Sequence, residues 1–480
     1  MTGVLEHRAA VPDWEAVVGL EIHVHLKTRT KMFCRCELEY FGEPNTRTCP
    51  VCLAHPGALP VANRKAVEWT IKLGLALGCE IADEAVFSRK NYFYPDNPKG
   101  YQISQYDRPL CVGGSLLVPG PDGDREVGFV RAHLEEDAAK TVHVGGATGR
   151  KVGSAHSLVD FNRGGTPLVE IVTQPDLRSA DEARRFLQLL RQTIVELGIS
   201  DAEMEKGTLR VDANVSVRPA GADELRTRWE LKNMNSFTFI ARGIAKAIED
   251  QTAIYMSGGE VVQETYDYEP GTNTLTPHRT KEEADDYRYF PEPDLVPVQP
   301  ERATVERLRG ELTGLPGERI VRLRDELGFA TAQTLVMGGL DALWVATRAA
   351  GADPTAAANV IANQLVGAGV DPGQVNAVEL AKLVEARDQI PRKTFHEAIS
   401  HAGDDAFTAE PYLEQKAVAD TSELEPIVDR VLAESASQVE QYRAGKVGVL
   451  GFFVGRVMKE TNGQADARVV NELLRQKLEA

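Results

Sequence analysis

A proline-rich segment, residues 291–300, separates two parts of this 480-residue chain that differ in sequence pattern. Before it, apolar and polar residues alternate in short runs such as 18–26, 167–172 and 208–217, separated by Gly, Pro, Asn and Asp. Alternation with a period of two indicates strands with one buried face, and such turn residues end them. After the segment, Ala and Leu recur in helix-forming stretches. The pattern predicts an α+β body followed by an all-α part.

Two helices are expected within the α+β part. Residues 63–77 begin with Asn63 as an N-cap, and residues 179–197 begin with a capping box formed by Ser179 and Glu182. A second break, rich in Gly, Asp and Pro, lies at residues 402–411. Because domains usually hold about 100–200 residues, we expect three parts. They are an α+β domain at 1–297, a helical domain at 298–408 and a helical tail at 409–480.

Composition excludes several classes of protein. Hydrophobic residues make up 42% of the chain and charged residues 26%, which is too apolar for a disordered protein. The N-terminus lacks a basic start followed by an apolar run, and no stretch reaches the ~18 apolar residues of a membrane span. We therefore expect a soluble, cytoplasmic protein. The net charge of -17 repels phosphate, so any nucleic acid must be bound by a local basic patch.

Four of the six cysteines form two close pairs, Cys34 with Cys36 and Cys49 with Cys52. Such pairs, separated by a turn-rich insert, are typical of the two knuckles of a tetrahedral zinc site. Four thiolates fill the coordination sphere, so this zinc would be structural rather than catalytic. The alternatives are four reduced thiols without metal, or His55 in place of one cysteine.

A second group of candidate ligands comes from strand patterns. In residues 18–26, Glu21 and His23 lie on the polar face, close enough to share Mg²⁺ or Mn²⁺, although a solvated sheet face gives the same pattern. Glu170 interrupts the apolar run 168–172, where a lone carboxylate is costly unless it is paired or metal-bound. Further polar residues stand at 133–137, where His133 precedes three acids, and on the strand containing Asp212, Asn214 and Ser216.

Between these strands, residues 89–105 combine basic, aromatic and turn-forming residues. Lys90 and Lys99 could neutralise phosphate while the aromatic rings stack on a base. The alternative is that the rings fill a core beneath a tight turn. The sequence contains no G-x-x-x-x-G-K-[ST], G-x-G-x-x-G, H-E-x-x-H or G-x-S-x-G motif, and no clear glutaminase nucleophile.

Taken together, these segments closely resemble the GatB/GatE family, which includes the GatB component of bacterial aspartyl/glutamyl-tRNA amidotransferases. The resemblance covers essentially the whole chain, because residues 445–474 are similar to the family's YqeY-like tail. The matching segments are VGLEIHVHL (18–26), RKNYFYPDNPKGYQISQYD (89–107), HLEEDAAK (133–140), SLVDFNRGGTPLVEIV (157–172), LRVDANVSVRP (209–219), ELKNMNSF (230–237) and DDYRYFPEPDL (285–295).

The resemblance implies a large, mainly antiparallel cradle domain, a helical domain and a tRNA-binding tail. It implies a ligase of protein biosynthesis that uses ATP and Mg²⁺ to activate the side-chain carboxylate of Glu on tRNA-Gln or Asp on tRNA-Asn as an acyl phosphate. Ammonia then displaces phosphate. An amidase subunit (GatA) supplies this ammonia from glutamine, and a small subunit (GatC) completes the heterotrimer.

The resemblance also implies site residues. Mapped onto this chain, the catalytic and magnesium-binding residues are Glu21, His23, Glu136 and Glu170, with Lys90 nearby. For ATP we expect contacts from Lys90, Tyr92, Asp212 and Asn214. The alternative function is a non-catalytic, zinc-bearing scaffold that binds tRNA, and a metal-dependent hydrolase is a third possibility. Which of the two misacylated tRNAs is used is left open.

Overall fold

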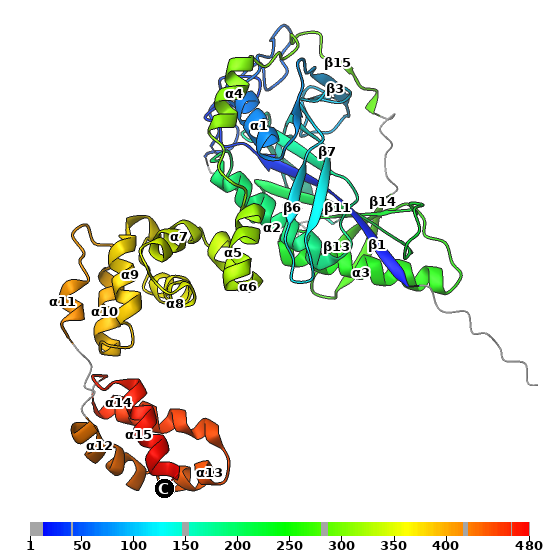
Figure 1. Cartoon of the computed structure of the whole chain (residues 1–480). Helices are drawn as coiled ribbons and strands as arrows, with labels where there is room; N and C mark the ends of the chain where they lie inside the picture. The colour runs from blue at the N-terminus through cyan, green and yellow to red at the C-terminus, as the bar shows by residue number, and fades with distance from the viewer. Residues whose placement is uncertain are drawn as a thin grey trace, which may run out of the picture. The chain divides into compact units, whose positions relative to one another are not determined.

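In the computed structural model, the described residues are 13–39, 42–145, 153–279, 287–415, 421–461 and 463–479. They form two compact units, Met1–Glu318 and Arg319–Ala480, each considered by itself below. Strands dominate the first unit, and the second is helical (Figure 1). The predicted α+β body followed by helices is therefore confirmed. Asp285 and Asp286, which belong to one of the segments quoted above, lie outside the described residues.

A ten-stranded sheet forms the centre of the first unit, in the order β14-β13-β12-β11-β1-β10-β7-β5-β2, with β6 paired to β7. All paired neighbours are antiparallel except β12 and β13. The bounds are β1 (Trp14–His25), β2 (Glu80–Ile81), β5 (Cys111–Val112), β6 (Ser115–Val118), β7 (Arg125–Glu136), β10 (Pro167–Thr173), β11 (Leu209–Pro219), β12 (Trp229–Lys232), β13 (Thr265–Glu269) and β14 (Thr274–Arg279).

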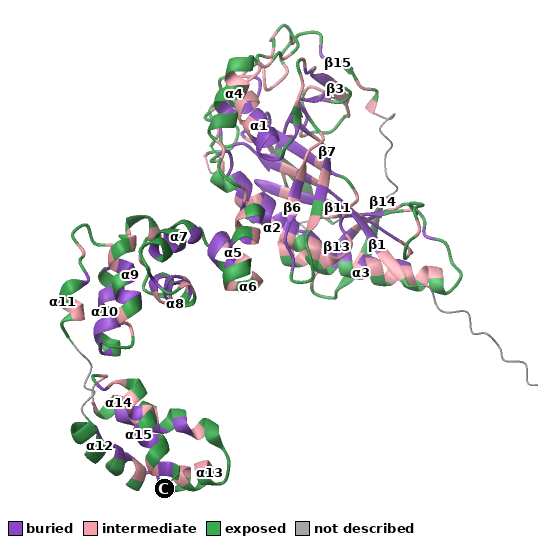
Figure 2. Ribbon diagram, in the orientation of Figure 1, coloured by how far each residue is buried: buried purple, intermediate pink, exposed green. Residues whose placement is uncertain are grey.

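Strand β1 lies in the middle of this sheet, between β10 and β11. Its alternation places Leu20, Ile22 and Val24 in the core, as the buried colour along the central strands illustrates (Figure 2). The register with β11 brings apolar residues together, for example Ile22 opposite Val211. The same register leaves the polar residues of β1 next to polar residues of both neighbouring strands.

Three helices belong to this sheet domain: α1 (Arg64–Ala76), α2 (Ala180–Glu196) and α3 (Phe237–Met256). The Asn63 side chain accepts hydrogen bonds from the first turn of α1, as predicted. The N-cap at Ser179 is also confirmed, because its Oγ accepts a hydrogen bond from the Glu182 amide. The return bond of the predicted capping box is shifted by one residue, since the Glu182 carboxylate accepts from the amide of Arg178 rather than from that of Ser179. Helices α2 and α3 pack together, and α3 packs on β11.

Two small sheets complete the first unit. In one, β15 (Phe290–Pro291) pairs with β3 (Ser88–Asn91), which pairs with β4 (Tyr101–Ser104). The other is the hairpin of β8 (Lys140–Val144) and β9 (His156–Asp160). The first small sheet brings the aromatic segment that follows residue 286 beside the aromatic segment 89–105, although the two are far apart in sequence.

The structure differs from the expected division at one point. Helix α4 (Arg302–Gly310) follows the proline-rich segment and was expected to open the helical domain, but it packs on α1 in the first unit. Ion pairs from Lys72 to Glu311 and from Arg307 to Glu68 support this contact. Local sequence predicts a helix here, but the surface on which it packs is decided by tertiary contacts.

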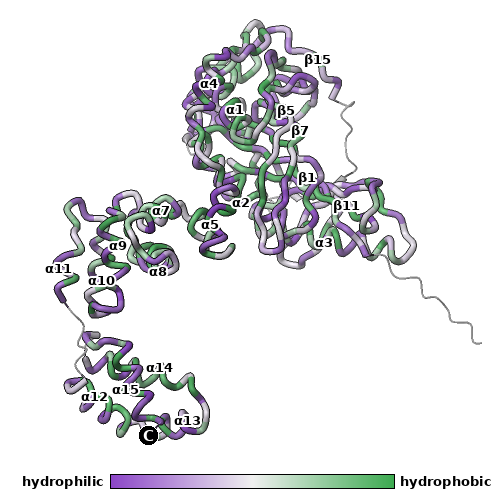
Figure 3. Tube along the Cα trace, in the orientation of Figure 1, coloured by the Kyte–Doolittle hydropathy of each residue, from purple (hydrophilic) through white to green (hydrophobic). Residues whose placement is uncertain are grey.

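The elements described in the second unit are helices. Hydrophobic and hydrophilic residues alternate along their trace (Figure 3). Side chains of α12, α14 and α15 form a buried apolar cluster that includes Val428, Phe453 and Leu474. The expected boundary between residues 408 and 409 stays a prediction. The helix bounds are α5 (Pro316–Leu327), which crosses the unit boundary, α6 (Phe329–Met337), α7 (Asp341–Ala349), α8 (Pro354–Asn359), η2 (Val360–Leu365), η3 (Pro372–Gln374), α9 (Ala377–Ala386), α10 (Arg392–His401), α11 (Glu410–Leu413), α12 (Thr421–Ala433), α13 (Ala436–Arg443), η4 (Val447–Val449), α14 (Leu450–Glu460) and α15 (Ala467–Glu479).

In the part of the chain that the structure describes, no single helix is long and apolar enough to cross a membrane. Helices α6 and α7 together reach the required length and hydropathy, but they are bent by 113° at the break between them.

Candidate functional site

Three side chains from three adjacent strands converge on the polar face of the central sheet: His23 of β1, Glu170 of β10 and Glu135 of β7. The register places His23 opposite Glu170 and Glu170 opposite His133, and Glu135 follows two residues later on the same side of β7. Their ligand atoms lie within 4.8 Å of one another, and His23 Nε2 is 3.3 Å from Glu170 Oε2. Two carboxylates and an imidazole fit a divalent cation such as Mg²⁺ or Mn²⁺.

The charges in this cluster depend on one another. Burial and the nearby charge of Glu170 raise the pKa of Glu135. Burial also opposes ionisation of Glu170, but the surrounding His133, His23 and Lys90 hold its pKa well below the ordinary value. Burial lowers the pKa of His133 to about 4. Two carboxyl groups this close remain ionised together only where positive charge compensates them. Lys90 and His23 supply part of that charge, and a divalent cation held between the carboxylates would add to it.

Lys90 of β3 and Tyr92 border the cluster of His23, Glu135 and Glu170. Their predicted roles, phosphate binding and contact with ATP, stay predictions. Burial by itself would lower the pKa of Lys90, but the charges of Glu135 and Glu170 raise it. Burial raises the pKa of Tyr92. The charge of Lys90 opposes this rise, and the charge of Glu135 adds to it. The ammonium of Lys90 lies 5.0 Å from the centre of the Tyr287 ring, a contact that favours the charged form. Lys90 is thus a fixed positive charge beside the acids.

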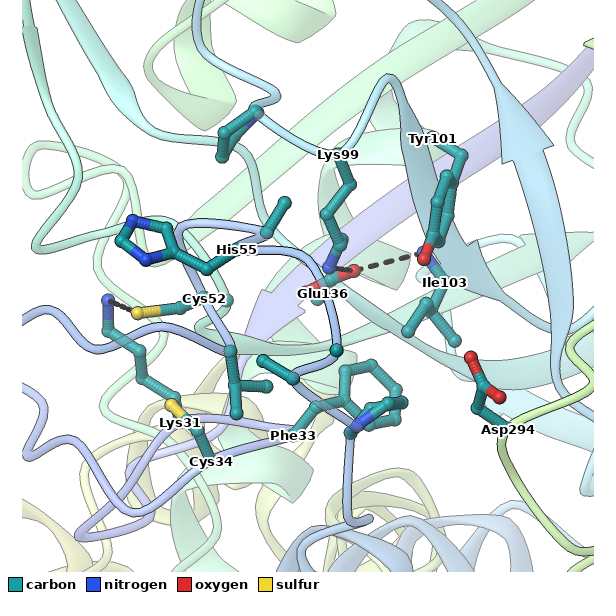
Figure 4. Close-up of a pocket in the computed structure, with 17 residues that line it drawn as sticks. Lys31, Phe33, Cys34, Cys52, His55, Lys99, Tyr101, Ile103, Glu136 and Asp294 are labelled. Atoms are coloured by element: carbon teal, nitrogen blue, oxygen red, sulfur yellow. Dashed lines mark hydrogen bonds and ion pairs between the residues drawn. The ribbon is translucent and has the colours of Figure 1, made fainter.

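Glu136 faces the other way. Because successive residues of a strand point to opposite faces, Glu136 lies on the side of β7 away from Glu135. Its carboxylate forms an ion pair with Lys99 and accepts a hydrogen bond from the Ile103 backbone amide at 3.0 Å. Both Glu136 and Lys99 line a cavity of about 260 Å³ (Figure 4). The structure does not bring Glu136 together with His23 and Glu170, and Glu135 takes that position. The sequence does contain a signal for this. His133 and Glu135 are two residues apart, so on one strand they point to the same face, whereas Glu136 points to the other.

Glu21 and the predicted ATP-contacting residues Asp212 and Asn214 form a neighbouring group. Glu21 lies opposite Asp212 in the β1–β11 register, and Asn214 donates to Glu21 at 3.2 Å. Lys232 of β12 lies 3.1 Å from Asp212 and 3.5 Å from Glu230. Burial opposes the charge of Lys232, but these carboxylates raise its pKa. Glu21 therefore lies outside the three-residue cluster, in an acidic group whose charge Lys232 offsets in part.

A further buried network, which the sequence did not indicate, surrounds Asp137. Its carboxylate lies 2.8 Å from His25 Nε2, 3.0 Å from Arg210 and 3.4 Å from Arg163. Burial opposes ionisation, but Arg210 and the His25 hydrogen bond hold the pKa of Asp137 well below its usual range. Arg210 is the β11 residue opposite His23, so this network fixes the strand ends beside the cluster. Its partners lie far apart in sequence, and no local pattern reveals them.

The four cysteines Cys34, Cys36, Cys49 and Cys52 converge as predicted, with their sulfur atoms within 4.8 Å of one another. Cys49 Sγ and Cys52 Sγ are 3.9 Å apart, which suits a tetrahedral site with Zn–S bonds of ~2.3 Å. The Cys34 hydrogen bond lowers the pKa of Cys52 to about 4, and the nearby Lys31 ammonium, 3.7 Å away, acts in the same direction. His55 lines the neighbouring cavity but does not belong to the converging set.

Comparison with known proteins identifies what this chain is similar to. Residues 16–306 match the model of the GatB/GatE catalytic domain, and residues 345–478 match the GatB domain model. Three relatives carry the name of the B component of aspartyl/glutamyl-tRNA(Asn/Gln) amidotransferase. The protein of Syntrophotalea carbinolica is 45% identical over 97% of this chain and 98% of its own length. The protein of an Anaeromyxobacter species is 46% identical over 98% of this chain and 99% of its own length. That of Persephonella marina is 43% identical over 97% and 100%.

Proposed function

Because the chain belongs to the GatB/GatE family, we propose that it performs the activation and transfer steps of a glutamine-dependent tRNA amidotransferase. In this proposal it converts Glu on tRNA-Gln, or Asp on tRNA-Asn, to the amide with ATP, Mg²⁺ and ammonia. The observation that carries the proposal is the convergence of His23, Glu135 and Glu170 beside Lys90. A site that must hold a carboxylate and a triphosphate together needs positive charge, which Lys90 and a divalent cation held by these three residues would supply.

The chemistry has two steps. An oxygen of the substrate carboxylate attacks the γ-phosphorus of ATP, the bond to the β-phosphate oxygen breaks, and ADP leaves with that bond's electron pair. Ammonia then attacks the carbonyl carbon of the acyl phosphate, and phosphate leaves as the nitrogen loses a proton. Bound Mg²⁺ would offset charge on the phosphate oxygens. Its ligands would be His23, Glu135 and Glu170, while Lys90 would pair with the transferred phosphoryl group.

Several further parts of the proposal rest on the family alone. Ammonia would come from an amidase subunit (GatA), with a small subunit (GatC) completing a heterotrimer, since the relatives are named as one component of a multi-subunit enzyme. The zinc site would hold the lobe of residues 34–60, and residues 409–480 would contact tRNA. The protein would work in the cytoplasm, where translation takes place.

The division of labour between subunits gives a first testable prediction. The isolated chain is expected to release no ammonia from glutamine. In an assembly whose amidase nucleophile has been inactivated, high ammonium should restore amidation of Glu-tRNA-Gln or Asp-tRNA-Asn, because external NH₃ replaces the channelled nucleophile. The measurement is amide formed on tRNA, with and without ATP.

Glutamine hydrolysis by the isolated chain at the rate of the full assembly would contradict this division. Failure of the zinc- and magnesium-replete assembly to use ATP on misacylated tRNA, with tRNA binding intact, would instead support the non-catalytic scaffold.

A further inference from the structure

Two aromatic segments from distant parts of the chain, one with Tyr106 and one with Tyr287 and Tyr289, meet beside the cluster of His23, Glu135 and Glu170. The rings of Tyr106 and Tyr289 are stacked, with centroids 4.2 Å apart and planes 8° apart. Tyr287 meets Tyr289 edge-on at 6.2 Å. Although Tyr289 covers part of its ring, Tyr106 remains 42% exposed, and the adjacent Phe290 is 44% exposed. Tyr289 itself is half-buried, so the exposed part of the pair is the ring of Tyr106, held in place by Tyr289 and able to offer a stacking surface.

A buried ion pair fixes this aromatic arrangement. Arg89 of β3 donates two hydrogen bonds to Glu292, at 2.7 and 2.8 Å, and the Glu292 side chain is fully buried. The side-chain amide of Asn91 donates hydrogen bonds to the backbone carbonyl oxygens of Tyr287 and Arg288. Two-point contact between guanidinium and carboxylate is geometrically specific. The segment that carries Tyr287 and Tyr289 is therefore held on β3 in one position.

The aromatic pair lies within reach of the reacting groups. Lys90 follows Arg89 on β3, and its ammonium lies over the Tyr287 ring at 5.0 Å. Tyr289 is close enough to Lys90, Glu135 and Glu170 for their charges to act on its phenol. Cations also accompany the neighbouring rings, since Arg89 lies 5.7 Å from the centre of Phe290 and 4.3 Å from that of Tyr101.

We propose that the stacked pair of Tyr106 and Tyr289 is a platform on which the unpaired base of the 3′-terminal nucleotide of aminoacyl-tRNA stacks. This inference rests on the function proposed above, because only a tRNA substrate brings its terminal base so near the reacting carboxylate. The amino acid is esterified to the terminal ribose, and an extended aminoacyl group spans only about 7 Å. The terminal base must therefore lie beside the cluster.

Charge and chemistry favour this occupant over a protein partner. Unpaired nucleobases are bound by aromatic faces combined with Arg and Lys, which is the combination present here. Arg89 is paired with Glu292 and Asp294, and Lys90 lies beside Glu135 and Glu170, so both hold the rings in place. Arg288, between Tyr287 and Tyr289 in the sequence, is exposed and supplies a positive charge that suits a phosphodiester backbone.

The test uses a tRNA-Gln acceptor minihelix with 2-aminopurine in place of the terminal adenine, added to the full assembly above its dissociation constant. Stacking quenches 2-aminopurine, so its fluorescence should fall severalfold on the unaltered protein and stay near the free-probe value on Tyr106→Ala. Tyr106→Phe, which keeps the ring, should restore the quenching. Tyr255→Ala is the matched control, because Tyr255 of α3 belongs to another stacked pair, with Trp14 at the start of β1, whose ring centroids are 5.2 Å apart.

In amidation assays, Tyr106→Ala should raise the KM for misacylated tRNA about tenfold, the size of one base–aromatic stack, without changing the KM for ATP. Unchanged quenching in Tyr106→Ala would overturn the proposal. A raised KM for ATP alone would reassign the platform to the adenine of ATP, and loss of partner subunits on gel filtration would reassign it to a protein interface. Quenching needs no catalysis, so it separates this proposal from failure of the proposed function.

Discussion

Glu170→Gln is expected to abolish ATP-dependent activation while leaving tRNA affinity and subunit assembly nearly unchanged. The substitution keeps the shape of the side chain but removes the charge that faces His23 at 3.3 Å and His133 at 3.9 Å. Loss of a metal ligand removes several kcal/mol of transition-state stabilisation, or about a thousandfold in rate. The measurement is tRNA-dependent phosphate release, accompanied by titration with Mn²⁺ followed by electron paramagnetic resonance.

Two comparisons sharpen this prediction. Glu135→Gln should lose Mn²⁺ binding as Glu170→Gln does, whereas Glu136→Gln should retain it, because Glu136 lies with Lys99 on the other side of β7. Glu126→Gln, an exposed position on the same strand, is the control for charge loss alone. Normal phosphate release by Glu170→Gln would exclude Glu170 as a ligand, and equal Mn²⁺ loss in Glu136→Gln would contradict the geometric assignment.

Cys49→Ser is expected to remove zinc and unfold the lobe around it. Among the described residues between 34 and 60, none is buried, so no apolar core holds this lobe together. A structural zinc site contributes about 10 kcal/mol or more in small zinc-binding peptides, and here it would replace the missing core. The variant should therefore lower stability and protection from proteolysis in this lobe more than it lowers the rate of the chemical step.

Elemental analysis of protein purified without added metal should find about one zinc per chain, and close to none in Cys49→Ser. Cys79→Ala is the matched control, since Cys79 lies outside the cysteine cluster and should leave the zinc content unchanged. Absence of zinc from the unaltered protein, with all four thiols reacting freely in the native state, would refute the site.

Local patterns were sufficient to predict much of the fold. The alternation of β1, the N-caps at Asn63 and Ser179, and the close cysteine pairs depend on neighbouring residues, and all are found in the structure. Glu170 was also recognisable, because a single carboxylate within an apolar strand requires a compensating partner.

Other features depend on contacts between distant segments. Alternation shows that Glu135 shares a strand face with His133 and that Glu136 does not. Only the pairing of β10 with β7, which places Glu170 opposite His133, shows that this face carries the cluster. The Asp137 network joins residues from four separate segments of the chain. The aromatic pair of Tyr106 and Tyr289 likewise depends on the pairing of β15 with β3, two strands far apart in sequence. Sequence patterns show which residues are costly to bury, but tertiary pairing decides which partners they meet.

The most direct test of the central claim, that this chain activates the substrate by phosphoryl transfer, is an isotope measurement. Misacylated tRNA carrying ¹⁸O in the side-chain carboxyl group of its Glu is amidated with ATP and ammonium, and the released phosphate is analysed by mass spectrometry. Activation as an acyl phosphate transfers one labelled oxygen to phosphate for each amide formed, because the attacking carboxylate oxygen leaves with phosphorus. Amide formation that releases only unlabelled phosphate would contradict the account.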